Sequence, residues 1–188
     1  MIHIVGPKYK TPDDAVIINT TSRSNDWSRG LSPFFAGPVS LYGSYRSINV
    51  ENAWQFSKVY YNQVDDKNEP SQVYFDWAQK GWNDIKAHRY PMGKGAKPLF
   101  SYWDGEHLTY VEARKKIYIP LYSIAVQKTY AFGKLKKMHE EGQNLYLWDF
   151  DGYDHKALGC SYDEVINNPD RKMGHAFVIG MLLEGYLK

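Results

Sequence analysis

The sequence predicts a mainly α fold of the α+β kind: a single compact helical domain over residues 1–188 with a few short strands. A chain of 188 residues is the length of one ordinary domain and is long enough to bury a hydrophobic core. Aromatic residues make up 16% of the chain, which excludes a disordered polypeptide. Most segments long enough to form a regular element have the pattern of helices rather than strands.

The first part of the chain is expected to contain strands and loops. Residues 2–5 and 15–19 are short apolar segments that predict strands, and Gly6 ends the first. The polar residues of 20–29 predict a loop. The prolines and glycines of 31–43 exclude a long regular element there.

The remaining elements are expected to be helices, with one further strand. Asn49 is a suitable N-cap for a helix over 49–64, and Ser71 for a second helix that reaches about residue 86. Pro120 is expected to kink or split a third helix, over 109–125. The other expected elements are a helix over 128–140, a strand over 144–150, and helices over 162–168 and 172–187.

Charge and cysteine content narrow the classes of function. The 23 basic and 21 acidic residues give a net charge of +2, so any nucleic-acid contact would need a local patch. Cys160 is the only cysteine, which excludes an internal disulfide and a cysteine-based metal cluster. The N-terminal residues do not resemble a signal peptide, and no apolar run approaches the length of a membrane span. We therefore expect a cytoplasmic protein with no membrane partner.

Three polar residues of the expected helix over 49–64 fall on one face. Glu51, Gln55 and Lys58 have the spacing i, i+4 and i+7, which aligns them along an α-helix. The spacing is compatible with a solvated surface and with the wall of a cleft.

The polar loop over 20–29 contains residue types that bind phosphate. Arg23 is surrounded by serines and an asparagine, and guanidinium and hydroxyl donors match phosphate oxygens geometrically. A solvated loop is the alternative interpretation. The glycine-rich segment over 92–97 lacks the GxxxxGK[ST] spacing, so it is not a P-loop.

The segment WDFDGYD, residues 148–154, is a second candidate site. Asp149 and Asp151 are compatible with binding Mg²⁺ or Mn²⁺, with hydrogen bonds to ribose hydroxyls, or with a solvated turn. The six histidines are scattered and none pairs at the spacing of metal ligands, so we expect no metal site of that kind. Among the aromatic residues, which are mainly expected in the core, Trp103 is a candidate to stack on a base.

Two motifs near the N-terminus resemble a known family. The segment LSPFFAGPV (31–39) followed by NVENAWQFSK (49–58) is similar to the paired N-terminal motifs of the NADAR family. The matching positions are Ser32, Phe34, Glu51, Asn52, Trp54, Gln55 and Lys58, followed in the family's order by Ala96-Lys97, Trp103-Asp104, Arg114 and residues 174–183. The chain thus resembles a divergent member over residues 17–185. Asn52 stands where the family usually has His, and WDFDGYD stands near the place of its late Trp-Gly element.

The resemblance implies N-glycoside chemistry on ribose-linked substrates. NADAR enzymes include ADP-ribosyl hydrolases that strip ADP-ribose from nucleobases in DNA and so reverse modification by toxins. Others are similar to enzymes that cleave the base–sugar bond of riboflavin-pathway intermediates. The expected partner is therefore ADP-ribosylated DNA or an ADP-ribose-like small molecule, with no cofactor and no obligate protein partner. By analogy, such a protein would serve as an anti-toxin, as in phage counter-defence.

Within this interpretation each candidate residue has a role. Glu51 stabilises the oxocarbenium-like transition state or activates the attacking water, and Lys58 donates to the leaving base or fixes the glutamate. The substrate-binding residues are expected to be Arg23, Ser32, Phe34, Asn52, Gln55, Trp103, Asp149 and Asp151. Two other functions stay open: a metal-dependent glycosyl or nucleotidyl transferase that uses Asp149 and Asp151, and a non-catalytic module that binds ADP-ribose or DNA.

Overall fold

The computed structural model describes all 188 residues and shows a mixed α+β fold with three small sheets. Helices account for 36% of the residues and strands for 14%. The prediction of a mainly α fold is therefore wrong, because the sequence analysis missed four strands between residues 39 and 108. None of the helices combines the length and the apolar character needed to span a membrane.

The chain divides into two compact units, which are described separately. Unit 1 contains residues 1–36 and 122–188, and unit 2 contains residues 37–121. Unit 1 is thus assembled from both ends of the chain. The organisation of residues 1–188 as one domain stays a prediction.

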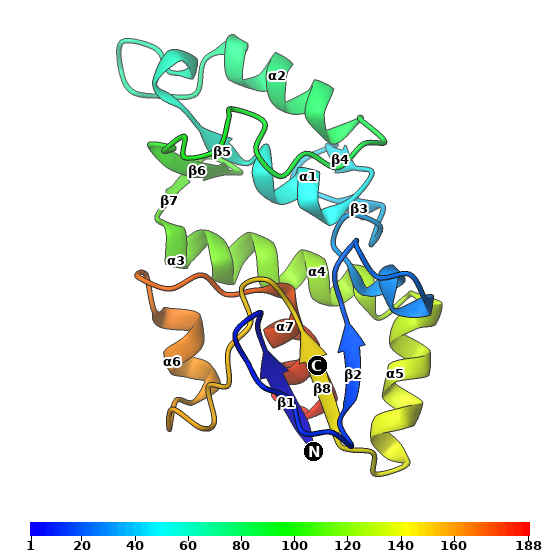
Figure 1. Cartoon of the computed structure of the whole chain (residues 1–188). Helices are drawn as coiled ribbons and strands as arrows, with labels where there is room; N and C mark the ends of the chain where they lie inside the picture. The colour runs from blue at the N-terminus through cyan, green and yellow to red at the C-terminus, as the bar shows by residue number, and fades with distance from the viewer. The chain divides into compact units, whose positions relative to one another are not determined.

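Unit 1 is built on a parallel sheet of three strands. The central strand β8 (Leu145–Trp148) lies between β1 (Ile2–Val5) and β2 (Val16–Asn19) and is parallel to both. All three strands were predicted from their apolar runs. Figure 1 shows that their carboxyl ends lie at the same edge of the sheet, where Val5, Trp148 and Asn19 are in register.

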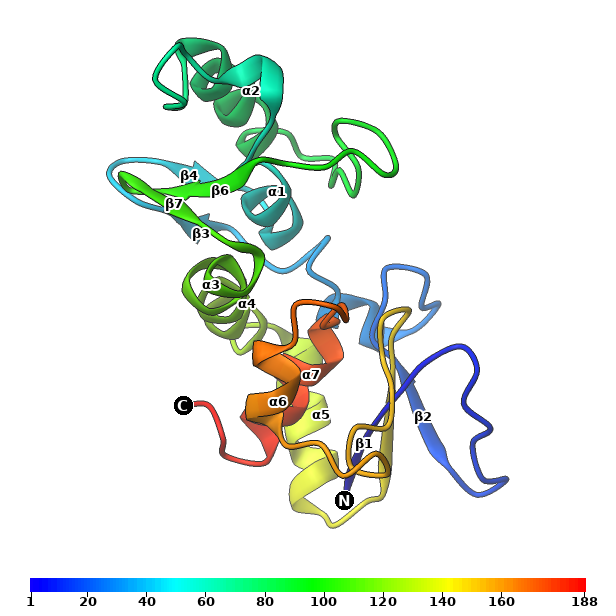
Figure 2. The ribbon, with the colours of Figure 1, turned by 90° about the vertical axis from the view of Figure 1, so that its left-hand side faces the viewer.

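The helices of unit 1 follow the predicted order. They are α5 (Tyr130–Glu140), α6 (Tyr162–Asn167) and α7 (His175–Leu183), with a short 3-10 helix, η1 (Trp27–Leu31). The helix α7 is apolar on all sides and packs on β1 and β8, and Figure 2 shows it on one face of the sheet. It is shorter than the predicted 172–187, because Gly174 is its N-cap.

Unit 2 contains two small antiparallel sheets. One pairs β3 (Val39–Ser40) with β4 (Arg46–Ser47), and the other has the order β5 (Lys58–Val59), β6 (Phe100–Trp103), β7 (Glu106–Leu108). Asp104 and Gly105, with φ of 47° and 84°, form the turn between β6 and β7. Two residues at positive φ are typical of a type I′ hairpin.

The helices of unit 2 are α1 (Val50–Gln55), α2 (Gln72–Trp82) and the 3-10 helix η2 (Tyr61–Gln63). Asn49 caps α1 as predicted, since its side chain accepts a hydrogen bond from the backbone of Asn52. The predicted extension of this helix to residue 64 is wrong. The chain leaves the helix after Gln55, and Lys58 and Val59 pair with β6 instead. The β-branched Val59 and the two tyrosines that follow it favour this extended path.

The predicted helix over 109–125 is present without a break. It consists of α3 (Tyr110–Ala113), a π-helical turn η3 (Arg114–Tyr118) and α4 (Ile119–Val126). Pro120 does not split the helix. The π turn lies directly before it, and a wider turn fits a residue that has no N–H for the usual bond.

Candidate functional site

The ten predicted site residues fall equally into the two units. Glu51, Asn52, Gln55, Lys58 and Trp103 belong to unit 2, and Arg23, Ser32, Phe34, Asp149 and Asp151 belong to unit 1. Each group is therefore built up within its own unit.

Three predicted residues of unit 2 form a hydrogen-bonded chain, here called the Glu51–Lys58 chain. The Nε2 of Gln55 donates to Oε1 of Glu51 at 3.0 Å, and Nζ of Lys58 donates to Oε1 of Gln55 at 2.8 Å. The orientation of the Gln55 amide is determined, because a carboxylate can only accept and an ammonium group can only donate. Gln55 thus links the acid to the base.

The Glu51–Lys58 chain is not a solvated helix surface. Glu51 is 6% exposed and Gln55 is 9% exposed, while Lys58 is partly buried. Lys58 is also not on the helix, as the sequence analysis assumed. It is held in place by strand pairing opposite Ser101, and its side chain turns back to Gln55.

Aromatic residues surround this chain on one side. Trp54, one turn after Glu51 on α1, packs against Tyr118 and Tyr110 with ring centroids 5.2 and 6.2 Å apart. The ammonium of Lys58 lies 4.9 Å from the Trp54 ring, and the guanidinium of Arg114 lies 4.6 Å from the Tyr110 ring. We call Trp54, Tyr110, Arg114 and Tyr118 the Trp54 cluster.

The chemical content of the two groups together is a carboxylate, two cations and several aromatic rings. Carboxylates stabilise positive charge on a sugar carbon, cations bind anionic groups, and aromatic rings stack on flat heterocycles. Sequence reasoning named Arg114 only as part of a family pattern and did not place Tyr110 and Tyr118 at the site. Their common spacing of four residues, 110, 114 and 118, was the available signal.

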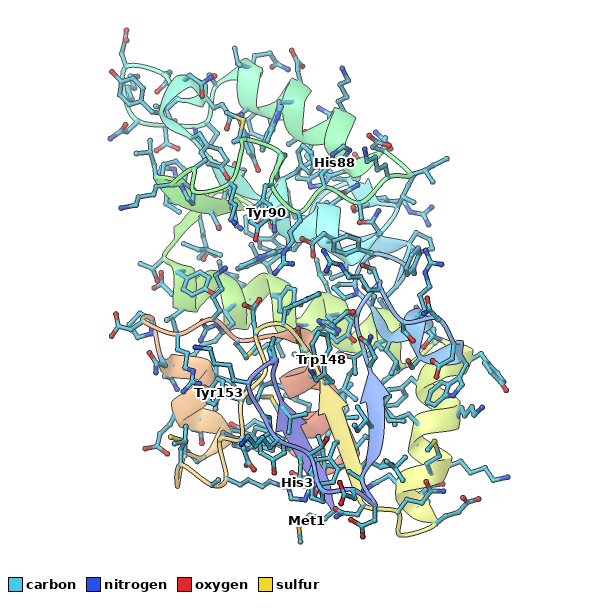
Figure 3. All side chains as sticks on the ribbon, in the orientation of Figure 1. Met1, His3, His88, Tyr90, Trp148 and Tyr153 are labelled. Carbon is cyan, nitrogen blue, oxygen red and sulfur yellow. The ribbon has the colours of Figure 1, made fainter.

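Asn52 is engaged by the backbone of the loop that follows α2. Its Nδ2 donates to the carbonyls of Asp84 and Lys86 at 3.1 and 2.9 Å, and its Oδ1 accepts from the backbone N–H of His88 at 2.8 Å. His88 is labelled in Figure 3. Both amide hydrogens and the amide oxygen are used, so we assign Asn52 a structural role and remove it from the proposed site.

Trp103 belongs to the aromatic packing around Tyr42. Its ring meets that of Tyr42 edge-on, with centroids 5.1 Å apart. Tyr42 also contacts Tyr45 and Trp82, and burial raises the pKa of its hydroxyl above the ordinary value. Within unit 2, Trp54 is therefore a better candidate than Trp103 to stack on a ligand beside Glu51.

Arg23, Ser32 and Phe34 lie in the loops of unit 1. Arg23 is exposed, and its guanidinium lies 5.1 Å from the ring of Phe150. Ser32 is 2% exposed, ends η1, and accepts a hydrogen bond from the backbone of Phe34 at 3.3 Å. Of these three residues, Arg23 has the exposure expected of a phosphate ligand.

Asp149 holds the start of α7 on the sheet. Its Oδ2 accepts from the backbone N–H of Ala176 at 3.2 Å and lies 3.1 Å from Nδ1 of His175, while its Oδ1 accepts from the backbone of Asp151 at 3.3 Å. Asp149 is 3% exposed, and Figure 3 labels Trp148, the last residue of β8 before it. Asp151, which donates through its backbone, is partly buried.

His175 completes this arrangement. Its Nε2 donates to the carbonyl oxygen of Thr20 at 2.8 Å, so that β8, the loop after β2 and α7 are joined by one imidazole. Gly174 is required next to it, because a β-carbon at that position would collide with the Asp149 carboxylate. No group of three or more His, Cys, Asp or Glu side chains in the structure is arranged to hold a metal ion. The WDFDGYD segment thus contributes Asp149 to the packing of unit 1.

A protein-family model matches residues 6–179, and its description is a family of unknown function, DUF6939. The chain belongs to this family. No curated protein matches the chain, and no solved structure does. The DUF6939 match covers all ten predicted site residues and the Trp54 cluster. It does not connect the chain with the NADAR family, and that resemblance stays a prediction.

Proposed function

We propose that this DUF6939 protein is an N-glycosyl hydrolase that removes ADP-ribose from modified nucleobases in DNA. The observation that supports it best is the buried carboxylate of Glu51, bonded through Gln55 to Lys58 and placed beside the Trp54 cluster. The N-terminal motifs at 31–39 and 49–58 supply the second line of support, because they resemble those of NADAR hydrolases.

The proposed reaction breaks the bond between C1 of ribose and a nitrogen of the base. The bond's electron pair leaves with the base, and positive charge develops on the sugar, where the Glu51 carboxylate stabilises it. Water attacks C1 and gives one proton to Glu51, while the base nitrogen takes up a proton. Lys58 provides the positive charge at the leaving base, and Gln55 keeps the carboxylate in orientation.

The remaining assignments follow from residue type and exposure. The rings of Trp54, Tyr110 and Tyr118 suit the flat heterocycle of the substrate. Arg23, exposed in unit 1, is proposed to bind the pyrophosphate. The proposal needs no cofactor, and its setting is the cytoplasm of a bacterial or phage-infected cell, where it reverses the effect of a DNA-modifying toxin.

The test is the release of ADP-ribose from DNA that carries ADP-ribose on guanine or on thymine. We expect turnover by the wild type with at least one of the two substrates, and a decrease of about 10²–10⁴-fold in kcat for Glu51→Gln. Glu140→Gln, which alters an exposed glutamate, is the matched control and should keep wild-type activity.

Other results would favour the other two functions. Activity that disappears with EDTA and with Asp149→Ala, while Asp149→Ala remains folded, would indicate a metal-dependent transferase. Binding of ADP-ribose without turnover of either DNA would indicate a non-catalytic module. Both results contradict the hydrolase.

A further inference from the structure

Unit 2 buries one acidic and one basic side chain. Glu51 is 6% exposed and Arg114 is 2% exposed, and these are the charged residues among the buried polar groups of that unit. Removing a charge from water costs several kcal/mol unless another group compensates it. The pairing of charges in this interior is therefore a strong constraint on its design.

Glu51 and Arg114 flank the same aromatic contact. Glu51 precedes Trp54 by one turn of α1, and Arg114 lies one turn from Tyr110 and one from Tyr118. Since the Trp54 ring packs on both tyrosines, the carboxylate and the guanidinium approach the contact from its two helices.

The π turn selects Arg114 among three consecutive cations. Within η3, Arg114, Ile117 and Tyr118 are buried, whereas Lys115 and Lys116 are exposed. A π turn adds one residue to a helical turn and so changes which side chains face the packed side, and such turns are frequent at functional sites. The strain of an irregular turn thus coincides with the burial of a guanidinium.

We propose that Arg114 is a positioning residue for Glu51: its guanidinium compensates the buried carboxylate and fixes its orientation. The electrostatic coupling is a property of the folded protein. Its effect on turnover rests on the proposed function. The two consequences are measured separately.

The coupling is tested by a double-mutant cycle in urea unfolding, with wild type, Glu51→Gln, Arg114→Gln and the double variant. Each single variant leaves one buried charge uncompensated, and the double variant removes both. We expect the double variant's unfolding constant to be at least tenfold smaller than the two single effects predict together. The exposed pair Glu106 and Lys116 is the control cycle and should give additive effects.

Additive effects at Glu51 and Arg114 would overturn the proposal. If Arg114→Gln fails to fold, a folded double variant supports the coupling, and a double variant that is also unfolded contradicts it.

The kinetic test uses Arg114→Lys, which keeps the charge and loses the planar fork. With ADP-ribosylated DNA, a positioning role predicts a lower kcat, a nearly unchanged KM and an acid limb of the pH–rate profile that moves. A higher KM with unchanged kcat and profile would show instead that Arg114 binds substrate, and would overturn the assignment. If the wild type shows no turnover, the proposed function fails and the unfolding cycle alone decides on Arg114.

Discussion

Asn52 and Glu51 are neighbours on α1, yet their side chains have different tasks. Asn52 spends all its hydrogen-bonding capacity on three backbone groups of the loop at 84–88, and Glu51 faces Gln55. The NADAR-like motif does not separate these tasks, because both residues are polar and adjacent. Only the partners distinguish a structural amide from a candidate catalytic acid.

Asn52→Ala should therefore lower stability. The change leaves two carbonyl groups and one N–H of the loop without their partner, and we expect a loss of about 2 kcal/mol in the free energy of unfolding. Urea unfolding measures it, with the exposed Asn25→Ala as control, which should change stability by less than about 0.5 kcal/mol. Equal stability of the two variants would contradict the structural assignment.

His155 gives a prediction about pH. It is 2% exposed between the rings of Tyr162 and Phe177, and burial lowers the pKa of its imidazole below the ordinary 6.5. Lys156 adds to this shift, while Glu184 and Asp154 oppose it. Because the unfolded chain binds the proton more readily, this residue's contribution is intact above pH 6.5. It is lost as the pH falls below 6.5 toward the lower pKa of the folded state.

Replacing this imidazole by a ring that does not titrate should flatten the pH dependence of stability. Urea unfolding of wild type and His155→Phe at pH 7.5 and pH 5.5 provides the comparison. We expect the wild type to lose more stability than the variant between the two values. The same loss in both proteins would show that the His155 proton does not distinguish the folded from the unfolded state.

At the scale of elements, two glycines test the packing of unit 1. A β-carbon at Gly174, the N-cap of α7, would collide with the carboxylate of Asp149, whereas one at Gly133 in α5 would meet no neighbouring atom. We expect Gly174→Ala to destabilise the protein by about 1–3 kcal/mol. Gly133→Ala should stabilise it by about 0.5–1 kcal/mol, through helix propensity. Thermal unfolding of both variants measures the difference, and the same sign for both would refute it.

Elements that rely on local signals were predictable, and elements that rely on pairing were not. The apolar runs gave β1, β2 and β8, and the cap at Asn49 gave the start of α1. The end of α1 depends on β5 meeting β6, some forty residues later. The hairpin of β6 and β7 had a local signal in Asp104-Gly105, but the rings of Tyr102 and Trp103 were assigned to the core and the turn was overlooked.

At the scale of the whole molecule, the candidate residues lie in two units with separate tasks. Spacing alone predicted that Glu51 and Gln55 share a helix face, and the structure joins them by a hydrogen bond. Lys58 reaches the same chain from a strand, which no helical spacing predicts. The structural role of Asp149 depends on His175 and Ala176, which are distant in sequence. Such tertiary partners are the part of the site that one sequence without relatives does not reveal.

Asp149→Ala is the variant that separates the two units. Its carboxylate links β8 to α7, and its removal leaves His175 buried without its acidic partner, so we expect unit 1 to lose about 3–5 kcal/mol. Hydrogen exchange resolved along the chain should show faster exchange in β1, β8 and α7. The amides of α2, around the buried Trp82 of unit 2, should keep their protection, because that core is built from other residues.

The exposed carboxylate of Asp13, also in unit 1, provides the matched control, and Asp13→Ala should leave exchange unchanged in both units. An equal loss of protection in α2 and α7 of Asp149→Ala would show that the two units unfold together. Unchanged exchange in Asp149→Ala would contradict the structural role of this carboxylate and return Asp149 to the candidates for ligand binding. The experiment thus decides whether WDFDGYD belongs to the architecture of unit 1 or to its chemistry.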